Sequence, residues 1–435
     1  MKIAFVTNFL YPEGLGGTEL YCYQLANALI ERGNEVYWFV PNFNSVSTLS
    51  EERGRGIKVV KFAAVDQTGK PVLNFITGSF TQEMKARDIR IAHFNEFGGD
   101  DGISTGLLEA TKKAGIATIV TLHLVNYVCR SGTLHFGGTV PCNGKVNLSR
   151  CSSCYLFSDA GSSTALNLGM ARLFDNVFKI PGIKTLPKIK SLMNGINLKS
   201  IFISSISEYA DRIVTLTEWF RDVLLINGTP VNKIIYIPQV SPEIREGMPT
   251  VEKESRNGYV FVGRVNKEKG VDLLLDIAIK LKTHLPGVVI DLYGPYTPTE
   301  VLPHTQISNL NNFDNIHYKG VLRLDEVLPV MSKYKAVILP SRVAEMAPLI
   351  IMEANKLKVP VIASDVPGSA ELVRQYDCGL IFKYRSAEDL YKKISEIESD
   401  MHEFTFKQPA ENEFYHVAKK YEEVYKSCIT QANAG

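Results

Sequence analysis

The chain has 435 residues, of which 45% are hydrophobic and 22% are charged, and its formal net charge is +2. This length predicts two domains of about 200 residues each. The nearly balanced charge excludes a general affinity for nucleic acid. An apolar run of about 18 residues, long enough to span a membrane, is absent from the sequence.

The amino-terminal segment and the cysteine content favour a cytoplasmic protein. Residues 1–8 contain one lysine and an apolar run too short for a signal peptide, so we expect them to form a buried strand. Seven cysteines in a chain of this length do not resemble the disulfide framework of a small secreted domain.

Apolar runs of strand length alternate with segments of helical period, which predicts an α/β fold with two doubly wound, Rossmann-like parallel sheets. The predicted strands of the first series are Ile3–Thr7, Glu35–Val40, Val59–Phe62, Ile89–His93, Ala117–Leu122 and Arg212–Leu216. Those of the second series are Tyr259–Val262, Val288–Tyr293, Ile316–Lys319, Ala336–Pro340 and Val359–Ser364. A polar stretch rich in Pro and Gly, residues 238–258, predicts the interdomain connection.

The first strand is followed by a glycine-rich turn, Gly14-Leu-Gly-Gly-Thr-Glu19, and then by a helical pattern over 20–32. The turn lacks the Gly-x-Gly-x-x-Gly spacing of a dinucleotide fingerprint, which argues against a dehydrogenase. Its glycines still allow a ligand to approach the backbone at a helix N-terminus, although a plain tight turn would need them too.

Four cysteines lie close together in the N-terminal half: Cys129, Cys142, Cys151 and Cys154. Tetrahedral thiolate sites suit zinc, and a Cys-x2-Cys hairpin can present two ligands, so a structural zinc knuckle is the favoured interpretation. An iron–sulfur cluster, or free or bridged cysteines, are the alternatives. His135 is a spare ligand within the same insertion, residues 124–160.

Residues 176–207 contain no acid and five lysines interleaved with apolar side chains: Lys179, Lys184, Lys188, Lys190 and Lys199. Such a segment can lie on an anionic membrane surface, or it can be an ordinary basic face of an acceptor cleft. Pro181, Pro187 and Gly195 interrupt the pattern, so we do not expect one continuous amphipathic helix.

The opening strand of the second series leads into Gly263-Arg264 and on to Lys269-Gly270. A guanidinium and an ammonium on one loop suit a diphosphate, whose charge they can neutralise without a metal ion. The alternative is a solvated basic turn, as expected for the neighbouring Lys267 and Glu268.

Two carboxylates eight residues apart, Glu345 and Glu353, follow a buried strand pattern. Pro348 suits the first turn of a helix, which puts Glu345 in a loop and Glu353 inside the helix. A carboxylate at the carboxyl end of a parallel strand, beside a helix N-terminus, is placed where open α/β sheets bind phosphorylated ligands. Glu353 can accept two hydrogen bonds from a ribose diol, although two solvated glutamates would show the same spacing.

In this order the motifs resemble the nucleotide-sugar glycosyltransferases of the GT-B fold, in particular the retaining family 4, or glycosyl transferases group 1. The motifs are Gly16-Gly17, Gly263-Arg264, Lys269-Gly270, Pro340-Ser341, the Glu345/Glu353 pair, and 360–364 with Gly368 and Glu371. A subset of this family is similar in having a four-cysteine insertion.

The resemblance implies two Rossmann-like domains that face each other across a cleft. Residues 1–240 would form the acceptor side, 258–405 would bind the donor, and a terminal helix over 411–435 would cross back to the first domain. Many relatives use lipid-linked acceptors, so peripheral contact with the inner face of the membrane is expected.

The resemblance also assigns roles to residues. Catalytic roles fall to Glu345, His123, Arg264 and Lys269. Donor binding falls to Gly17, Gly263, Arg264, Lys269, Val321, Glu345, Ala347, Pro348, Leu349 and Glu353. His123 would reach the donor sugar from the end of its strand, with His93 a poorer candidate, and Val321 would meet the base.

The resemblance implies a glycosyltransferase that uses a nucleotide-diphosphate sugar and retains anomeric configuration. Since Arg264 and Lys269 can neutralise the diphosphate, we expect catalysis to be independent of a metal ion. The acceptor would be a glycan, a lipid-linked sugar or a small molecule in polysaccharide or glycolipid biosynthesis. Same-face attack, in which Glu345 positions the sugar, and a covalent glycosyl-enzyme both remain open. The alternatives are a GT-B sugar-nucleotide epimerase and a catalytically inert partner that binds nucleotide sugars.

Overall fold

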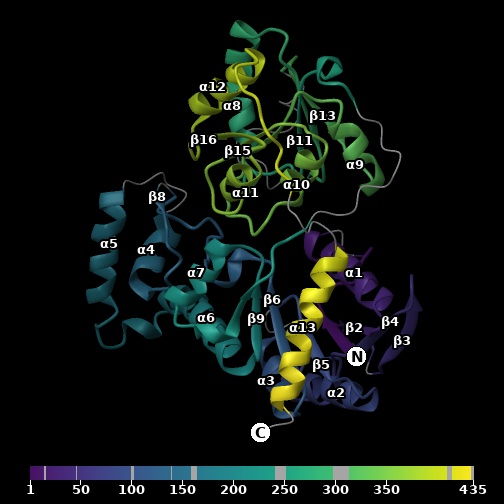
Figure 1. The fold of residues 1–435 in the computed structure, drawn as a ribbon. Coiled ribbons are helices and arrows are strands. Elements are labelled where there is room, and N and C mark those ends of the chain that lie inside the picture. The colour runs from purple at the N-terminus through teal and green to yellow at the C-terminus, as the bar shows by residue number, and fades with distance from the viewer. Residues whose placement is uncertain are drawn as a thin grey trace.

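The structure is a computed structural model of the chain. It describes residues 1–13, 16–45, 47–98, 102–138, 140–157, 164–240, 251–296, 313–408 and 414–432. Two sheets, the first mostly and the second entirely parallel, form two lobes, which Figure 1 shows one above the other. This confirms the predicted α/β fold class.

In the described residues, the first sheet has eight strands in the order β10-β9-β6-β5-β1-β2-β4-β3. Their bounds are β1 (Lys2–Val6), β2 (Glu35–Asn42), β3 (Leu49–Arg53), β4 (Ile57–Ala63), β5 (Ile91–Phe94), β6 (Ala117–Leu122), β9 (Arg212–Thr215) and β10 (Ile234–Tyr236). All neighbours pair in parallel except β3 and β4. After β1 the chain adds β2, β4 and β3 on one side of β1, and it then adds β5, β6, β9 and β10 on the other side. The strand order therefore reverses at β1.

The second sheet has the order β13-β12-β11-β14-β15-β16, all parallel. Its strands are β11 (Tyr259–Val262), β12 (Ile290–Tyr293), β13 (Ile316–Gly320), β14 (Ala336–Leu339), β15 (Val361–Ser364) and β16 (Gly379–Phe382). The order reverses between β11 and β14, and ligands of open α/β sheets bind at such a point, beyond the carboxyl ends of the strands.

Helices cover both faces of each sheet because side chains alternate between the faces along every strand. On β1, Ile3 and Phe5 join the hydrophobic cluster under α1 (Gly17–Glu31), while Ala4 and Val6 join the cluster on the other face. That second face is covered by α2 (Leu73–Ala86), α3 (Thr105–Lys113), α6 (Pro187–Tyr209) and α7 (Glu218–Ile226). One face of the second sheet is covered by α8 (Val271–His284) and α12 (Ala387–Glu398). The other face is covered by α9 (Leu324–Met331), α10 (Leu349–Lys356) and α11 (Ser369–Tyr376).

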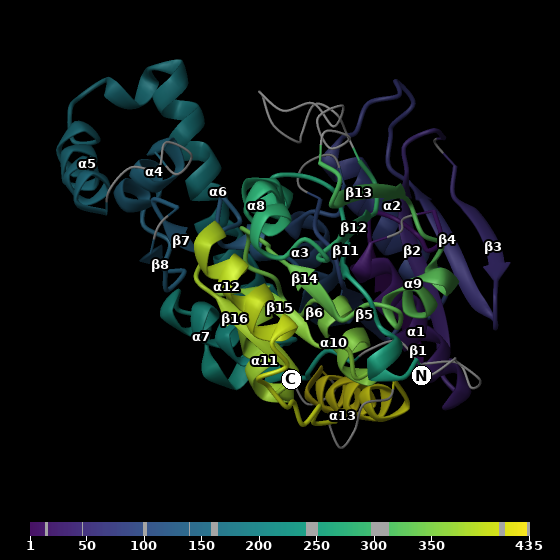
Figure 2. The same cartoon turned by 90° about the horizontal axis from the view of Figure 1, so that it is seen from above.

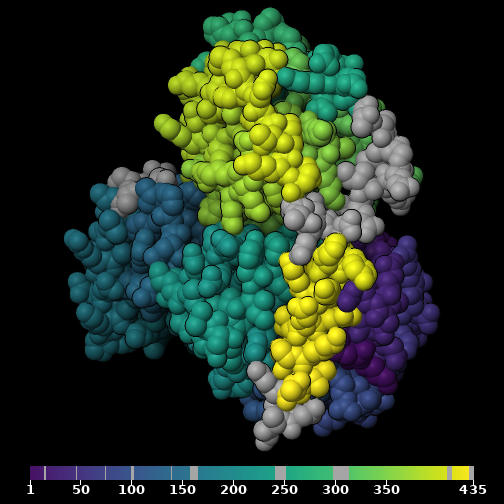
Figure 3. Space-filling view, viewed as in Figure 1, coloured from purple at the N-terminus to yellow at the C-terminus, as the bar shows by residue number. Residues whose placement is uncertain are grey.

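The last helix, α13 (Phe414–Ala432), packs on the N-terminal lobe, and the space-filling view shows it spread over that lobe (Figure 3). Its apolar side shares a cluster with α1 and β1. The hydroxyl groups of Tyr21 and Tyr421 lie 3.1 Å apart, and that of Tyr421 lies 3.0 Å from Thr121 Oγ1. Burial of this aromatic face therefore fixes the end of the chain to the first sheet.

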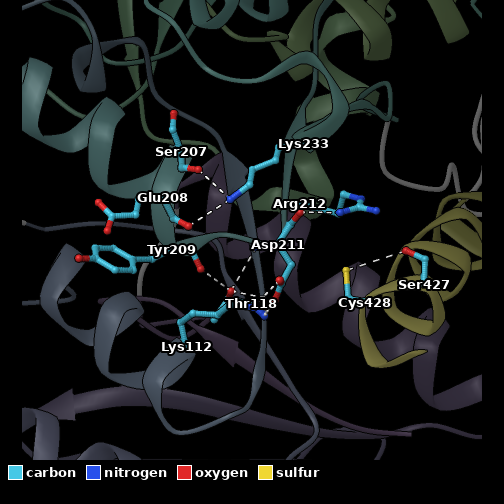
Figure 4. A network of polar contacts seen from close by, with 10 residues as sticks. All are labelled: Lys112, Thr118, Ser207, Glu208, Tyr209, Asp211, Arg212, Lys233, Ser427 and Cys428. Carbon is cyan, nitrogen blue, oxygen red and sulfur yellow. Dashed lines mark hydrogen bonds and ion pairs between the residues drawn. The ribbon is translucent and has the colours of Figure 1, made fainter. Parts of the chain in front are cut away.

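A polar network holds β6 and β9 together at their amino ends (Figure 4). The carboxylate of Asp211 accepts from Lys112 Nζ at 2.5 Å and from the backbone N–H of Thr118 at 2.9 Å. Lys233 Nζ donates to the carbonyl oxygens of Ser207 and Glu208 at 2.8 and 3.1 Å. The network stabilises the amino-terminal edge of the sheet. A ligand would bind at the opposite edge, beyond the carboxyl ends of the strands.

Two helices project beyond the first sheet: α4 (Leu148–Phe157) and α5 (Thr164–Val177), seen at the upper left of Figure 2. A short hairpin, β7 (His135–Phe136) with β8 (Val140–Pro141), precedes them. Cys151 and Cys154 therefore lie on a helix, which corrects the predicted Cys-x2-Cys hairpin. Gly195 does not interrupt α6, which runs from Pro187 to Tyr209, and the guanidinium of Arg130 lies where a Cβ at Gly195 would be.

Each predicted strand occurs within two residues of its predicted ends, and β3, β7, β8, β10 and β16 were not predicted. β3 is exposed and polar, so it lacks the apolar run that marks a strand. The predicted connection at 238–258 lies partly outside the described residues.

Candidate functional site

The loop after β11 and the loop after β14 meet at the point where the strand order of the second sheet reverses. Gly270 has a φ of +74°, and a Cβ there would lie 1.8 Å from the carbonyl oxygen of Pro340. Only glycine permits this approach. The backbone N–H of Arg342 donates to Glu268 O at 2.8 Å, which holds the two loops together.

This meeting of loops brings Lys269 and Glu345 into contact across 76 residues of sequence. Lys269 Nζ lies 2.5 Å from Glu345 Oε1, and Ser341 Oγ donates to the same oxygen at 2.8 Å. Both charged side chains are mostly shielded from solvent, with exposed fractions of 19% and 15%. The pair therefore presents a fixed ammonium and a fixed carboxylate at the carboxyl edge of the sheet.

Arg264 lies on the same loop as Lys269, but its side chain is 61% exposed and only 3.7 Å from Glu268 in a surface ion pair. Such a pair contributes little, about 0–1 kcal/mol. The guanidinium is therefore able to turn toward an anionic ligand at small cost. Gly263, with an extended φ of +157°, precedes it at the end of β11.

Glycine also shapes the backbone beneath Glu345. Gly368 has a φ of +84°, and a Cβ there would come within 1.7 Å of Glu345 O. The Glu345 N–H donates to Pro367 O at 3.0 Å. These contacts fix the Glu345 loop against the turn that opens α11.

Glu353 lies on α10, which begins at Leu349 after an N-cap at Pro348, with Ala347 just before it. The Glu353 side chain is buried, and desolvation raises its pKa to about 7. A carboxylate kept in such a place is costly unless a ligand compensates it.

The N-terminus of α1 faces the N-terminus of α10. A Cβ on Gly17 would lie 3.8 Å from Leu349 Cδ1, in ordinary van der Waals contact. Free N–H groups at helix N-termini attract anions, so two such ends from different lobes converge here.

The two histidines of the N-terminal lobe differ in their surroundings. His93 is fully buried, and its ring nitrogens lie 2.7 Å from Tyr425 Oη and 2.7 Å from Thr121 Oγ1, so its role is structural. His123 follows β6, where its Nε2 is 3.4 Å from Asn95 Oδ1. Burial lowers the pKa of His123 to about 3, so its ring is neutral and can donate a hydrogen bond without carrying charge.

Val321 lies just after β13 and is 63% exposed, while the carbonyl oxygen of Gly320 before it accepts from Gly294 N at 2.8 Å. The structure places Val321 at the carboxyl edge of the sheet but adds no contact that assigns it to a base.

A cavity of about 460 Å³ lies at the carboxyl edge of the first sheet, and sequence reasoning missed it. Its polar lining includes Asn8, Glu13, Asn42, Lys61 and Glu96. Two aromatic side chains that also line it, Phe9 and Phe43, are exposed. The sequence feature that could have indicated this cavity is the pair Asn8 and Glu96. These residues follow β1 and β5, the neighbouring strands where the strand order reverses.

The four cysteines of the insertion border one cavity of about 40 Å³. Gly137 N donates to Cys154 Sγ at 3.2 Å and Asn147 N to Cys151 Sγ at 3.4 Å. Burial raises the pKa of the Cys154 thiol to about 11. Within the described part of the chain, no group of three or more His, Cys, Asp or Glu is arranged to hold a metal ion, so the structure does not support the expected zinc site as it stands.

His135 does not serve as a ligand in this arrangement. Its Nδ1 lies 2.9 Å from Thr133 O, and its ring stacks on Tyr384.

Comparison with solved structures identifies the architecture. The chain aligns over its full length with sucrose-phosphate synthase from Thermosynechococcus elongatus, with a TM-score of 0.56, 14% identity and 98% of that chain covered. It aligns as completely with Anabaena HepE in complex with UDP, with a TM-score of 0.56, 15% identity and 98% coverage. The chain has the GT-B fold.

Sequence comparison adds a family match to this GT-B chain. Residues 245–413 match the family model of glycosyl transferases group 1. An uncharacterized glycosyltransferase of Methanocaldococcus jannaschii is 29% identical over 229 residues, which are 52% of this chain and 60% of that protein. Digalactosyldiacylglycerol synthase 1 of Arabidopsis thaliana is 27% identical over 51% of this chain and 27% of its own length. The chain thus spans less than two thirds of these relatives, and the matches do not favour an epimerase or an inert partner.

Proposed function

We propose that this GT-B protein is a retaining glycosyltransferase that moves a sugar from a nucleotide-diphosphate sugar to an acceptor hydroxyl. The observation that carries the proposal is the Lys269–Glu345 pair, held where the strand order of the second sheet reverses, with Arg264 on the same loop. The family match over 245–413 and the UDP complex of one structural neighbour support it.

In this proposal, residues 258–405 bind the donor and residues 1–240 the acceptor. Glu353 accepts hydrogen bonds from the ribose hydroxyls, and Arg264 and Lys269 neutralise the diphosphate. The sugar approaches Glu345 and the backbone over 347–349, while the α1 N-terminus at Gly17 contributes N–H groups. His123, neutral and at the end of β6, donates to a sugar oxygen from the opposite lobe.

Transfer breaks the bond between the anomeric carbon and the phosphate oxygen, and the nucleoside diphosphate leaves with the electron pair. The acceptor oxygen forms the new bond on the same face of the sugar, and its proton passes to the leaving phosphate. Positive charge grows on the sugar and negative charge on the phosphate. Lys269 and Arg264 stabilise the negative charge on the phosphate, and the Glu345 carboxylate stabilises the positive charge on the sugar. This preorganised charge lowers the barrier without a catalytic metal.

We infer that acceptor hydroxyl groups occupy the cavity of about 460 Å³ on the N-terminal lobe. Carboxylate and amide oxygens accept from hydroxyl groups, and exposed Phe9 and Phe43 offer faces for sugar rings. This composition favours a glycan or the sugar end of a lipid-linked acceptor, as expected in polysaccharide or glycolipid biosynthesis.

A donor panel tests the proposed function. The protein is incubated with nucleotide sugars, beginning with UDP-glucose, with and without oligosaccharide acceptors, and release of the free nucleotide is measured. We expect release from one donor, faster with an acceptor, and none from Glu345→Ala. A product that is still a nucleotide sugar would identify an epimerase. Tight binding without release from any donor would identify an inert partner.

We also infer that α5, α6 and the residues between them contact an anionic membrane surface. Besides the exposed Lys179, Lys184, Lys188 and Lys190, this region exposes apolar side chains that are each roughly half accessible: Leu168, Leu173, Ile180, Leu186, Leu198 and Ile201. Basic residues near an anionic surface contribute about 1 kcal/mol each. No helix of the described residues is long and apolar enough to cross a membrane.

Vesicle binding tests this surface. We expect the protein to sediment with vesicles that contain anionic lipid, less so in high salt, and not with zwitterionic vesicles. The double change Lys188→Glu and Lys190→Glu should weaken binding by about tenfold or more. The matched change Lys383→Glu with Lys392→Glu, on the donor lobe, should have little effect. Equal losses in both double variants would show that net charge, rather than this surface, drives binding.

Zinc at the four cysteines is a separate prediction. The convergence of the four residues on one cavity and the N–H donors to two sulfurs suit a thiolate site, which the metal would have to draw together. We expect about one zinc per chain in metal analysis of the purified protein, lost in Cys151→Ser but retained in Cys378→Ser. Protein that is folded and free of metal would disprove the site.

A further inference from the structure

The cysteine-bearing insertion touches the donor lobe at three places. Gly132 O accepts from Ala344 N at 3.3 Å, and Gly138 O accepts from Arg385 Nη1 at 3.1 Å. Between them, the rings of His135 and Tyr384 stack with their centroids 3.8 Å apart and 13° between their planes. One short stretch of the acceptor lobe, residues 132–138, thus binds two separate segments of the donor lobe.

On the donor side, these contacts lead to Glu345. Its neighbours Ala344 and Met346 are buried in the hydrophobic cluster of the first sheet, whereas Glu345 itself bonds to Lys269 and Ser341. The Tyr384 hydroxyl donates to Arg342 O at 3.1 Å, at the start of the same segment. Residues 342–346 are therefore held by both lobes at once.

On the insertion side, residues 132–138 are tied to the cysteines. Cys142 N donates to Leu134 O at 2.7 Å, and Gly137 N donates to Cys154 Sγ. His135 is 2% exposed, and its Nδ1 contact with Thr133 O fixes the plane of the ring that meets Tyr384. The stretch is thus braced by the residues that follow it in sequence.

We propose that residues 132–138 act as a strap that positions Glu345 for sugar transfer, with His135 and Tyr384 as positioning residues. The inference rests on the proposed function, because the placement of Glu345 matters for turnover only if it faces the donor sugar. Small displacements of a reacting geometry, of about 1 Å, can cost about 100-fold in rate. A strap that spans the two lobes therefore affects kcat more than donor binding.

Hydrogen exchange of the free protein tests the strap without any substrate. His135→Ala should raise exchange over 342–346, and Tyr384→Ala should raise exchange over 132–138, each across the boundary between lobes. His135→Phe should restore protection because it keeps the stacked rings, and His402→Ala, a histidine elsewhere on the donor lobe, should change neither segment. Changes confined to the lobe that carries the substitution would overturn the proposal.

Steady-state kinetics with the donor found in the panel provide the second measurement. We expect His135→Ala and Tyr384→Ala to lower kcat by about tenfold or more, with donor KM within about threefold and recovery in His135→Phe. Thermal unfolding checks that each variant is folded. If His135→Ala and Tyr384→Ala are not folded, Arg385→Ala takes their place, because it removes the Gly138 contact and a cation–π contact with the Tyr384 ring. If the exchange effects cross between the lobes but the wild-type protein turns over no donor, both the proposed function and the positioning role are wrong. The contact between residues 132–138 and the donor lobe is then structural only. Turnover at the wild-type rate in the alanine variants would also disprove positioning.

Discussion

Replacing Glu345 by glutamine lowers kcat for sugar transfer by about 100-fold or more and changes donor affinity little. Glutamine keeps the size of the side chain and can still accept from Ser341 and Lys269. It removes the negative charge that balances the positive charge on the reacting sugar. The charge is needed most in the transition state, so kcat rather than KM changes. Nucleotide release with saturating donor and acceptor measures the effect.

The control is Glu268→Gln, an exposed glutamate one residue from Lys269, which should keep wild-type kcat. Lys269→Met should also lower kcat, and the double variant with Glu345→Gln should lose less than the product of the single losses, because the two side chains contact each other. If Glu345→Gln retains more than a third of the wild-type rate, the carboxylate has no part in the chemistry.

The sequence predicted the strands that are buried on both faces and also some that are only partly buried, such as β12 and β13, but it missed the exposed strand β3. β1, β6 and β11 are continuous apolar runs, and each lies within one residue of its predicted bounds. β3 carries Ser, Glu and Arg on an exposed edge and pairs antiparallel to β4, so its hydrogen bonds, rather than its side chains, make it a strand. Hydrophobic periodicity reports burial and cannot register such an edge.

The candidate site shows the same division. Arg264, Lys269, Glu345 and Glu353 could be proposed from the sequence because parallel sheets place ligands at the carboxyl ends of strands. The contact of Lys269 with Glu345 was not predictable, since it depends on the close approach of Gly270 to Pro340. The cavity beside Glu96 and the stack of His135 on Tyr384 depend on loops from distant parts of the chain, whose mutual placement no local pattern encodes.

Glu353 should lower the free energy of unfolding of the ligand-free protein as the pH rises, and substitution by glutamine should remove this loss of stability. Its pKa is raised from 4.5 to about 7 in the folded chain. Between these values the folded state binds more protons than the unfolded state, so the free energy of unfolding falls with increasing pH. At about 1.4 kcal/mol for each pKa unit, the stability lost as the pH rises from 4.5 to above 7 is about 3 kcal/mol. Glu353→Gln should therefore stabilise the ligand-free donor lobe at pH 8 by up to about 3 kcal/mol and have little effect at pH 4.5.

The same burial should make nucleotide binding depend on pH in the opposite direction. Only the ionised carboxylate can accept from both ribose hydroxyls, so donor affinity of the wild-type protein should rise between pH 6 and pH 8 and level off above the pKa. Glu353→Gln should bind the donor at least about tenfold more weakly at pH 8, because hydrogen bonds to a charged acceptor are worth about 1.5–3 kcal/mol, and should lose this pH dependence. Calorimetric titration and urea unfolding at both pH values, with Glu268→Gln as the control, measure the two effects on one variant. A variant that gains stability at pH 8 yet binds donor as tightly as the wild type would show that Glu353 is buried for packing and does not hold the ribose.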